Sequence, residues 1–218
     1  MPSEAGHEAA RQETPSGLWT GAAPLILASK SATRRALLEA ARVPFEVAPV
    51  DVDERGLEAE ALAAGANAAI VAATLARAKA RAASRTAPGR LVVGADQTLS
   101  LGQIQLHKPV DREAARAQLA QLAGRTHALL SAVAVARDDL VLFETVEVAY
   151  LTMRPLDAPT LEAYLDAAGD AVLGSVGAYQ LEGLGIHLFT RIEGDHSVIL
   201  GLPLLPLLAF LRTEGVLK

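Results

Sequence analysis

The fold is decided by residues 25–41, which read LILASKSATRRALLEAA. Leu25–Ala28 form a short, continuous apolar run that is typical of a buried strand. Small and polar residues follow at Ser29–Ala32 and predict a turn. Thr33–Ala41 then has helical spacing, with its leucines on the inward side. A strand that leads through a short turn into a helix is typical of an α/β fold.

Strands and helices alternate along most of the chain, and two long strands then follow each other directly. Further strands are expected at 44–50, 91–95, 98–101, 104–106, 129–136, 140–150 and 186–192, and helices at 67–84, 111–123, 157–168 and 203–213. Two connections read as hairpins, Gly102-Gln103 and Arg137-Asp138-Asp139. This mixture predicts an α/β fold with a mixed β-sheet rather than a purely parallel one.

Composition limits the classes of function. The chain has 218 residues, of which 51% are hydrophobic and 21% charged, so it can bury the core of a folded domain. Its formal net charge of −5 argues against broad binding to nucleic acid or to a membrane surface, although a local basic pocket is still allowed. The sequence has no cysteine, which excludes disulfides, thiolate chemistry and Cys-ligated zinc.

The first residues differ from the rest. Met1–Thr20 is polar and lacks the basic start and apolar run of a signal peptide. No stretch reaches the roughly 20 apolar residues that a membrane-spanning helix needs. We expect residues 1–23 to form a disordered extension and residues 24–218 to form the domain, in a cytoplasmic protein.

The turn after the first strand carries groups that suit phosphate. Ser29, Ser31, Arg34 and Arg35 lie where a strand ends and a helix begins, and ligands collect at such strand ends in open α/β sheets. A helix N-terminus adds free N–H groups and the positive end of the helix dipole. Arginine can also hold two phosphate oxygens at once. The alternative is an ordinary helix cap at Ser31, followed by exposed arginines.

Two acidic features are expected near the same edge of the sheet. Asp51-Val52-Asp53-Glu54 follows a strand, and Asp96 comes directly after the apolar run 91–95. Carboxylates there suit Mg²⁺, which takes oxygen ligands and keeps several waters. A lone carboxylate at a strand end can also act as a general base. The alternatives are a solvated loop at 51–54 and a turn cap at Asp96.

Two lysines could neutralise phosphate charge. Lys79 shares a helical face with Leu75, and Lys108 precedes Pro109, which restricts it to an extended conformation. Taken alone, each lysine is better explained as a solvated side chain. Together with the hydroxyl, guanidinium and carboxylate groups, they indicate metal-assisted attack on a nucleotide polyphosphate. Walker A, GxSxG, HExxH and GxGxxG signatures are missing, and the 5 histidines show no metal-ligand spacing.

Taken in order, the motifs between residues 24 and 213 resemble those of the Maf-like nucleotide pyrophosphatase family. The opening LILASKSATRRALL at 25–38 resembles the family's LASxSxxRRxLL. The other matching segments are the acidic turn at 51–54, LARAKA at 75–80, GADQ at 94–97, HKP at 107–109, LAGRTH at 122–127, IEGD at 192–195 and GLP at 201–203.

The resemblance implies a two-lobed α/β fold, like that of the inosine-triphosphate pyrophosphatases, with the site in the cleft. It also implies hydrolysis of a nucleoside triphosphate to monophosphate and pyrophosphate with Mg²⁺ or Mn²⁺, as a house-cleaning reaction on modified or non-standard nucleotides. The implied site residues are Ser29, Arg34 and Arg35 for phosphate, Glu54 and Asp96 for holding the metal or activating water, and Lys79 and Lys108 for balancing charge.

One segment departs from the common family pattern DKAGAYGIQG. Residues 174–183 read GSVGAYQLEG, and Glu182 stands where that pattern has glutamine. This segment resembles the branch that acts on 7-methyl-GTP more than the dTTP/UTP branch. The Glu182 carboxylate could pair with a purine N–H or with a methylated, cationic ring. His107 also stands where the family has glycine before its Lys-Pro pair.

Two other classes of function remain open from the sequence. One is a non-catalytic, nucleotide-binding regulator of cell division, because the family has been linked to septum inhibition. The other is a sugar-nucleotide transferase, although no dedicated sugar pocket is indicated. The expected partner is a nucleoside triphosphate, without nucleic acid or membrane, and the sequence leaves the oligomeric state open, a homodimer included.

Overall fold

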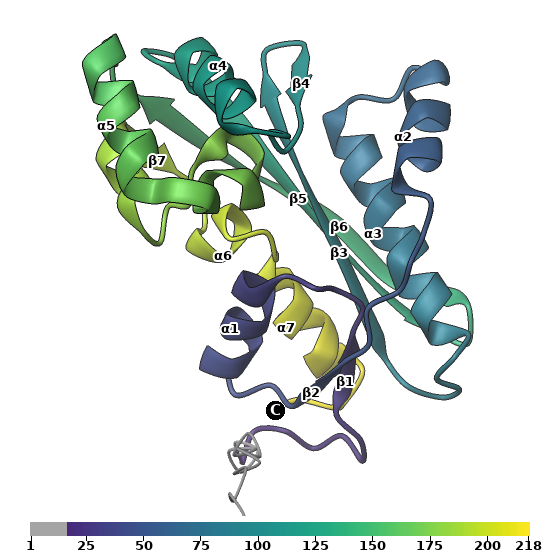
Figure 1. Ribbon diagram of the computed structural model, residues 1–218. Helices are drawn as coiled ribbons and strands as arrows, with labels where there is room; N and C mark the ends of the chain where they lie inside the picture. The colour runs from purple at the N-terminus through teal and green to yellow at the C-terminus, as the bar shows by residue number, and fades with distance from the viewer. Residues whose placement is uncertain (1–16) are drawn as a thin grey trace, which may run out of the picture.

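A seven-stranded mixed sheet runs through the computed structural model, which describes residues 17–218 (Figure 1). The strands lie in the order β2-β1-β3-β5-β6-β7, and β4 pairs with β3 beside this path. The strands are β1 (Leu25–Leu27), β2 (Phe45–Val47), β3 (Val92–Leu101), β4 (Ile104–Leu106), β5 (Thr126–Arg137), β6 (Leu140–Met153) and β7 (Phe189–Glu193). β1 is parallel to β2 and β3, and the remaining pairs are antiparallel, so the predicted mixed sheet is confirmed.

Helices cover both faces of this sheet. In Figure 1, α2 and α3 lie on one side of the long strands, and α1, α6 and α7 lie on the other. The helices are α1 (Ala32–Ala40), α2 (Glu54–Ala63), α3 (Ala68–Ser84), α4 (Arg112–Leu122), α5 (Ala158–Ala168), α6 (His196–Ile199) and α7 (Leu204–Thr213). Short 3₁₀ turns, η1 (Gly169–Gly174), η2 (Val176–Ala178) and η3 (Leu184–Leu188), connect α5 to β7.

Side-chain caps set the starts of the main helices. The Ser31, Asn67, Asp111 and Asp157 side chains each accept a hydrogen bond from the backbone N–H three residues later. Such caps satisfy N–H groups that the first helical turn leaves without partners. All five expected helices form within about one residue of their predicted starts, although α7 has no side-chain cap, and Gly169 ends α5 as predicted.

The two largest of four hydrophobic cores divide the described chain into two lobes. One core lies between β1, the first half of β3, α1 and α7, and it includes Leu27, Leu38 and Leu207. The other lies among the far half of β3, α4, α5 and the 3₁₀ turns, and it includes Leu119 and Leu165. The long strands β3, β5 and β6 pass through both lobes, so the expected two-lobed arrangement is present (Figure 1).

Helix α3 approaches the sheet closely because small residues face each other. Ala72, Ala76 and Ala80 of α3 pack against alanines of β5. Gly94 of β3 lies beneath the helix, where a Cβ atom would be 3.0 Å from Ala80 Cα and closer still to the Ala76 carbonyl oxygen. A residue larger than glycine would force helix and strand apart. This close packing brings Lys79, the residue before Ala80, beside Asp96, two residues after Gly94 on the same face of β3.

The structure corrects three expectations about secondary structure. β3 does not end at Asp96, which is paired with Ala132 in the middle of a strand that continues to Leu101. The acidic turn ends at Asp53, because Glu54 is the first residue of α2. The last strand is shorter than the predicted 186–192, since η3 occupies residues 184–188 before it.

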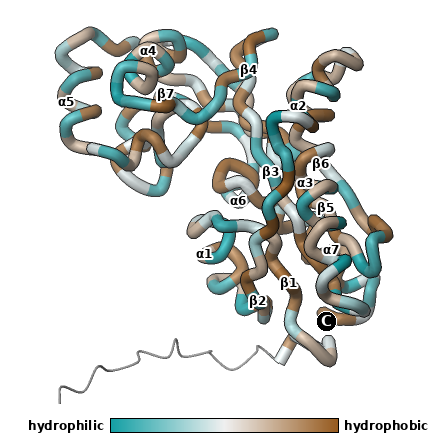
Figure 2. Tube along the Cα trace, turned by 45° about the vertical axis from the view of Figure 1, so that its right-hand side comes forward, coloured by the Kyte–Doolittle hydropathy of each residue, from teal (hydrophilic) through white to brown (hydrophobic). Residues whose placement is uncertain are grey.

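Only residues 17–23 of the disordered extension expected at residues 1–23 are described by the structure. The first sixteen residues lie outside the described part of the chain. Leu18–Gly21, however, pair with the other end of the chain: Trp19 forms a β-bridge with Leu217, and the Lys218 N–H donates to the Leu18 carbonyl oxygen at 2.9 Å. Hydrophobic β1 lies directly beyond this pairing (Figure 2). Within residues 17–218, no helix is both long enough and apolar enough to cross a membrane.

Candidate active site

A cavity of about 930 Å³ lies across the middle of β3, between the two lobes. The β1–α1 turn and the segment that leads from β2 into α2 contribute one part of its lining. The other walls come from α3, the residues after β4, the segment 174–182 and the loop after α6. Asp96 and Gln97 both line it, although neighbouring strand residues point to opposite faces of a sheet. The cavity therefore wraps around both faces of β3.

The β1–α1 turn gathers hydrogen-bond donors at one end of this cavity. The Ser31 hydroxyl accepts from the Arg34 backbone N–H at 3.3 Å, which caps α1. The Ser29 hydroxyl is buried and accepts from Arg34 Nη1 at 3.1 Å and from the Ser31 N–H at 3.3 Å. An anion at this end would meet the positive end of the α1 dipole and the donors of the turn.

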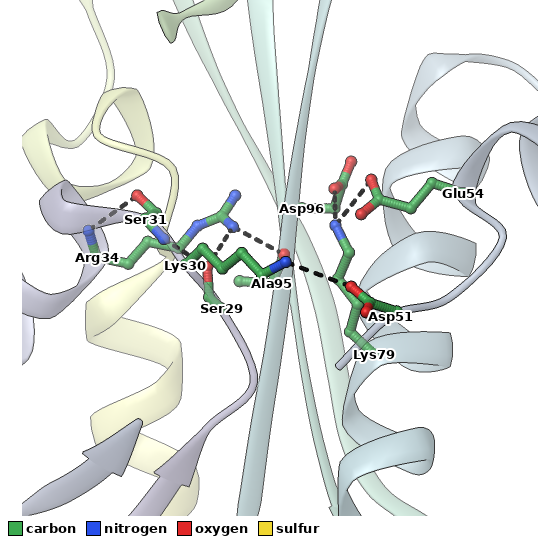
Figure 3. A network of polar contacts seen from close by, with 9 residues as sticks. All are labelled: Ser29, Lys30, Ser31, Arg34, Asp51, Glu54, Lys79, Ala95 and Asp96. Atoms are coloured by element: carbon green, nitrogen blue, oxygen red, sulfur yellow. Dashed lines mark hydrogen bonds and ion pairs between the residues drawn. The ribbon is translucent and has the colours of Figure 1, made fainter. Parts of the chain in front are cut away.

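The Arg34 guanidinium is fixed by backbone oxygens of distant segments. Nε donates to the Gly201 carbonyl at 2.7 Å and Nη1 to the Ala95 carbonyl at 2.9 Å. Burial lowers the pKa of Arg34, while the nearby Asp96 and Glu54 carboxylates raise it, and arginine stays charged in either case. The other terminal nitrogen points away from these partners (Figure 3). That N–H group can bind an anion without rearrangement of the side chain.

Lys79 of α3 joins two carboxylates opposite Arg34. Its Nζ lies 2.7 Å from Asp96 Oδ1 and 3.1 Å from Glu54 Oε2 (Figure 3). The Lys79 and Asp96 side chains are each 12% exposed, whereas Glu54 is 51% exposed. The three groups together carry one excess negative charge, and the Lys79–Asp96 pair is largely buried. They can attract a cation and can hold a proton on a carboxylate oxygen.

The residues at this point fit a divalent cation only together with a ligand. Within residues 17–218, no group of three or more histidine or acidic side chains could hold a metal ion by itself. Mg²⁺ is commonly bound by one or two carboxylates plus waters and substrate phosphates. Glu54 and Asp96 match that pattern, since both line the cavity that contains the anion-binding turn.

Two weaker contacts cross the cavity. Lys30 Nζ lies 3.3 Å from Asp51 Oδ1, and both side chains are exposed, so this ion pair contributes little to stability (Figure 3). At another wall, the Thr33 hydroxyl donates to Glu182 Oε1 at 3.3 Å. The structure thus places Glu182 across from the start of α1, as part of the cavity lining.

Lys108 reaches the cavity through the hairpin of β3 and β4. Glu58 of α2 accepts a hydrogen bond from the Gln105 side chain and lies 3.8 Å from His107 Nδ1. Gln118 of α4 donates to the His107 carbonyl oxygen at 2.6 Å. These contacts hold the residues before Lys108 between α2 and α4, and both His107 and Lys108 line the cavity.

The structure brings together all but one of the residues expected at the site. Ser29, Arg34, Glu54, Lys79, Asp96, Lys108 and Glu182 all line the cavity. Arg35 does not: it is exposed and is absent from the lining. Because successive helix residues are turned by about 100°, Arg34 and Arg35 face different surroundings.

Sequence reasoning missed Gln97 as a site residue. Its amide nitrogen donates to the Ser131 hydroxyl and to the carbonyl oxygens of Val198 and Ile199, at 2.9–3.1 Å. These bonds attach α6 to the sheet and fix the amide at the cavity wall. A polar residue inside an otherwise apolar strand was the available signal, but the strand was expected to end one residue earlier.

Fold and site together define an α/β protein whose cleft places hydrogen-bond donors suited to an anion beside paired carboxylates. Residues 24–214 match the model of the Maf family, described as "Maf-like protein", and the chain belongs to this family. A Bradyrhizobium diazoefficiens protein named nucleoside triphosphate pyrophosphatase is 57% identical over 201 residues, which cover 92% of this chain and 98% of the relative. A Rhodopseudomonas palustris protein of the same name is 55% identical with the same coverage.

A Brucella abortus protein named 7-methyl-GTP pyrophosphatase is also similar. It is 53% identical over 190 residues, which cover 87% of this chain and 96% of that protein. The family identification from the sequence motifs is therefore confirmed. The relatives are named as hydrolytic enzymes and match this chain over most of its length.

Proposed function

We propose that this protein hydrolyses a nucleoside triphosphate to the monophosphate and pyrophosphate. The observation that supports this most directly is the arrangement around β3, where Ser29 and Arg34 face the Lys79-linked pair Glu54 and Asp96 within one cavity. Phosphate binding and water activation need these two groups of side chains on either side of the reacting phosphorus. The names of the relatives support the same reaction.

The triphosphate is bound at the β1–α1 turn in this proposal. The free guanidinium nitrogen of Arg34 and the N–H groups at the start of α1 bind its oxygens. Lys108 approaches from the β4 side, where it neutralises the charge that gathers on the departing pyrophosphate. Arg35 takes no part, since it lies outside the cavity.

Attack of water occurs on the carboxylate side. The water oxygen bonds to the α-phosphorus, the bond from that phosphorus to the bridging oxygen breaks, and pyrophosphate leaves with the electron pair. Asp96 is positioned to accept the proton, because it lines the cavity and Lys79 holds only its Oδ1. Glu54 and Asp96 would hold a Mg²⁺ or Mn²⁺ ion, whose chemistry is charge neutralisation on phosphate oxygens.

Glu182 supports a purine substrate, and 7-methyl-GTP in particular. Its carboxylate lies in the cavity wall opposite Thr33, with one oxygen in the Thr33 contact. A carboxylate can accept hydrogen bonds from purine N–H groups and attracts a methylated, cationic ring. The relative named 7-methyl-GTP pyrophosphatase supports this choice among nucleotides.

Product analysis tests the proposal. Purified protein is incubated with dTTP, UTP, CTP, GTP or 7-methyl-GTP and with Mg²⁺ or Mn²⁺, and monophosphate and pyrophosphate are measured. We expect 7-methyl-GTP to be the best substrate, and Asp96→Asn to lower kcat about 100-fold or more with KM little changed. Release of orthophosphate, or equal rates in Asp96→Asn, would contradict the mechanism.

The same panel of nucleotides tests which base is preferred and whether the protein is a catalyst or only binds nucleotides. Glu182→Gln should lower the preference for 7-methyl-GTP over GTP, because the amide carries no charge to attract the cationic ring. Equal turnover of 7-methyl-GTP and dTTP by the wild type would refute the substrate assignment. Nucleotide binding without any turnover would instead favour a regulator without catalytic activity.

A further inference from the structure

His127 is a buried, titratable side chain that the proposed reaction does not use. It lies in β5 and is 1% exposed, in the core of the lobe that contains α4 and α5. Its Nε2 lies 2.6 Å from the Tyr179 hydroxyl oxygen, and its Nδ1 has no hydrogen-bond partner among the described residues. A buried histidine with one short bond and one unpaired nitrogen needs an explanation, because an unpaired polar group in a core is costly.

Hydrogen-bond counting determines the direction of the His127–Tyr179 bond. If the tyrosine hydroxyl donates to Nε2, then only the Nδ1–H group is left without a partner. If the imidazole donated instead, the tyrosine hydrogen would also lack an acceptor. The first arrangement is the cheaper one, so the imidazole is neutral and protonated at Nδ1. Burial favours the same neutral form, since it lowers the pKa of His127 to about 4.

Tyr179 belongs to the cavity wall that carries Glu182. Tyr179 is 4% exposed, its ring packs against Phe189 with the ring centroids 4.8 Å apart, and the residue contributes to the cavity lining. Glu182 lies three residues further along the same segment. A displacement of Tyr179 would therefore move the carboxylate that faces Thr33.

The backbone just before Tyr179 needs such an anchor. Gly177 and Ala178 have φ angles of +81° and +61°, and the second is unfavourable for a residue with a side chain. Besides the His127 bond, a hydrogen bond from the Tyr164 hydroxyl to the Ala178 carbonyl, at 3.3 Å, holds this turn. A strained turn persists only where its surroundings fix it.

We propose that His127 is a positioning residue that, through Tyr179, holds the wall carrying Glu182 and so determines which base is accepted. The inference rests on the proposed function, because it assigns the nucleoside end of the same cavity. The phosphate end is built from other elements, β1, α1 and the hairpin before Lys108. His127 should consequently affect base recognition and leave triphosphate binding alone.

The experiment compares His127→Phe, Tyr179→Phe and the double variant with the wild type. We expect each single variant to raise KM for 7-methyl-GTP about five- to tenfold and to reduce its preference over GTP. Inhibition by inorganic tripolyphosphate, which lacks a base, should change less than about twofold. The double variant should be no worse than either single one, because both remove the same bond.

Two further variants separate positioning from loss of stability. Leu165→Val removes a methylene from a fully buried side chain of the same core and does not touch the cavity, so the preference between nucleotides should persist. His127→Gln keeps an acceptor for the tyrosine hydroxyl and should recover part of the preference. Wild-type preference in His127→Phe, or a parallel weakening of tripolyphosphate inhibition, would overturn the inference.

The positioning role of His127 can still be tested if the wild type hydrolyses no nucleotide. That result removes the proposed function, and equilibrium binding of 7-methyl-GTP and tripolyphosphate then takes the place of KM and inhibition. Weaker binding of 7-methyl-GTP alone in His127→Phe still supports the positioning role. Equal losses for both ligands, or no binding of either by the wild type, refutes it.

Discussion

Arg34 and Arg35 are neighbours in sequence with opposite surroundings. Arg34 is fixed by the Gly201 and Ala95 carbonyls inside the cavity, whereas Arg35 is exposed. Arg34→Lys keeps the charge but loses the planar fork of donors, so we expect kcat/KM to fall about 100-fold. Arg35→Lys should change it less than about twofold. Steady-state kinetics on both variants check this, and equal losses in the two would contradict the assignment.

His127 also makes stability depend on pH in a predictable direction. Its pKa is about 4 in the folded protein and about 6.5 when unfolded, so between these values only the unfolded chain binds the proton. The contribution of His127 to the free energy of unfolding is therefore fully present above pH 6.5. It falls by about 1.4 kcal/mol per pH unit from pH 6.5 to pH 4, or about 3 kcal/mol in all.

His127→Gln should remove this contribution. Urea unfolding at several pH values from 7 to 4 measures the free energy of unfolding of both proteins. Carboxyl groups titrate in the same range in both, so the difference between the two curves isolates the histidine. The wild type should lose about 3 kcal/mol more than the variant on acidification. Parallel curves would show that His127 is not held neutral.

At the scale of elements, the contact between α3 and β3 determines the geometry of the carboxylate pair. Gly94 allows α3 to lie so close that Lys79 reaches Asp96 at 2.7 Å. Gly94→Ala would place a Cβ against the backbone of Ala76 and Ala80 and push the helix outward. We expect a loss of about 3 kcal/mol in unfolding free energy and at least about a tenfold loss in kcat.

Gly89→Ala is the matched control for this prediction. Gly89 lies between α3 and β3 at φ +71°, and an added Cβ would meet nothing within 4 Å. This variant should lose about 1 kcal/mol through backbone strain and keep its kcat. Denaturant unfolding and kinetics on both variants test the idea. Full activity in Gly94→Ala would show that the helix position does not control the site.

The elements themselves were predictable where short-range rules apply. The apolar run of β1, the caps at Ser31 and Asp157 and the hairpin turns have local signals, and the structure contains them. β3 was cut short because aspartate is unfavourable in strands. Its pairing with Ala132 and its bond to Lys79 outweigh that preference. Helix α2 was not among the expected helices. None of its residues is buried, so it lacks the buried apolar face from which helical spacing is recognised.

The site was predictable as a set of residues but not as an arrangement. The expected site residues could be assigned to one cavity, and all of them except Arg35 line it. That Lys79 lies between Glu54 and Asp96 depends on three elements that meet only after folding. Gln97 and Tyr179 were missed for the same reason, because their roles arise from packing between distant segments.

On the scale of the whole molecule, the two ends of the described chain stabilise one lobe. Trp19 packs against the core of β1, α1 and α7 and bridges Leu217. Trp19→Ala should lower the free energy of unfolding by about 2 kcal/mol, since a partly buried indole is lost. Leu18→Ala, at a side chain that is 57% exposed, should stay within about 0.5 kcal/mol. Thermal or denaturant unfolding measures both, and equal effects would argue against the packing role.

Because Leu18 is hydrogen-bonded to Lys218, the first and last described segments lie side by side. The elements could therefore follow one another along the chain in a different, circularly permuted order. In a chain cut to begin at Leu18, a short glycine-rich linker could join Leu18 to Lys218, and the chain could be opened at Asp138-Asp139, the two-residue turn between β5 and β6. Such a circular permutant would begin with β6 and end with β5. It would keep every residue that lines the cavity, because the fold holds that cavity by contacts that do not depend on where the chain starts.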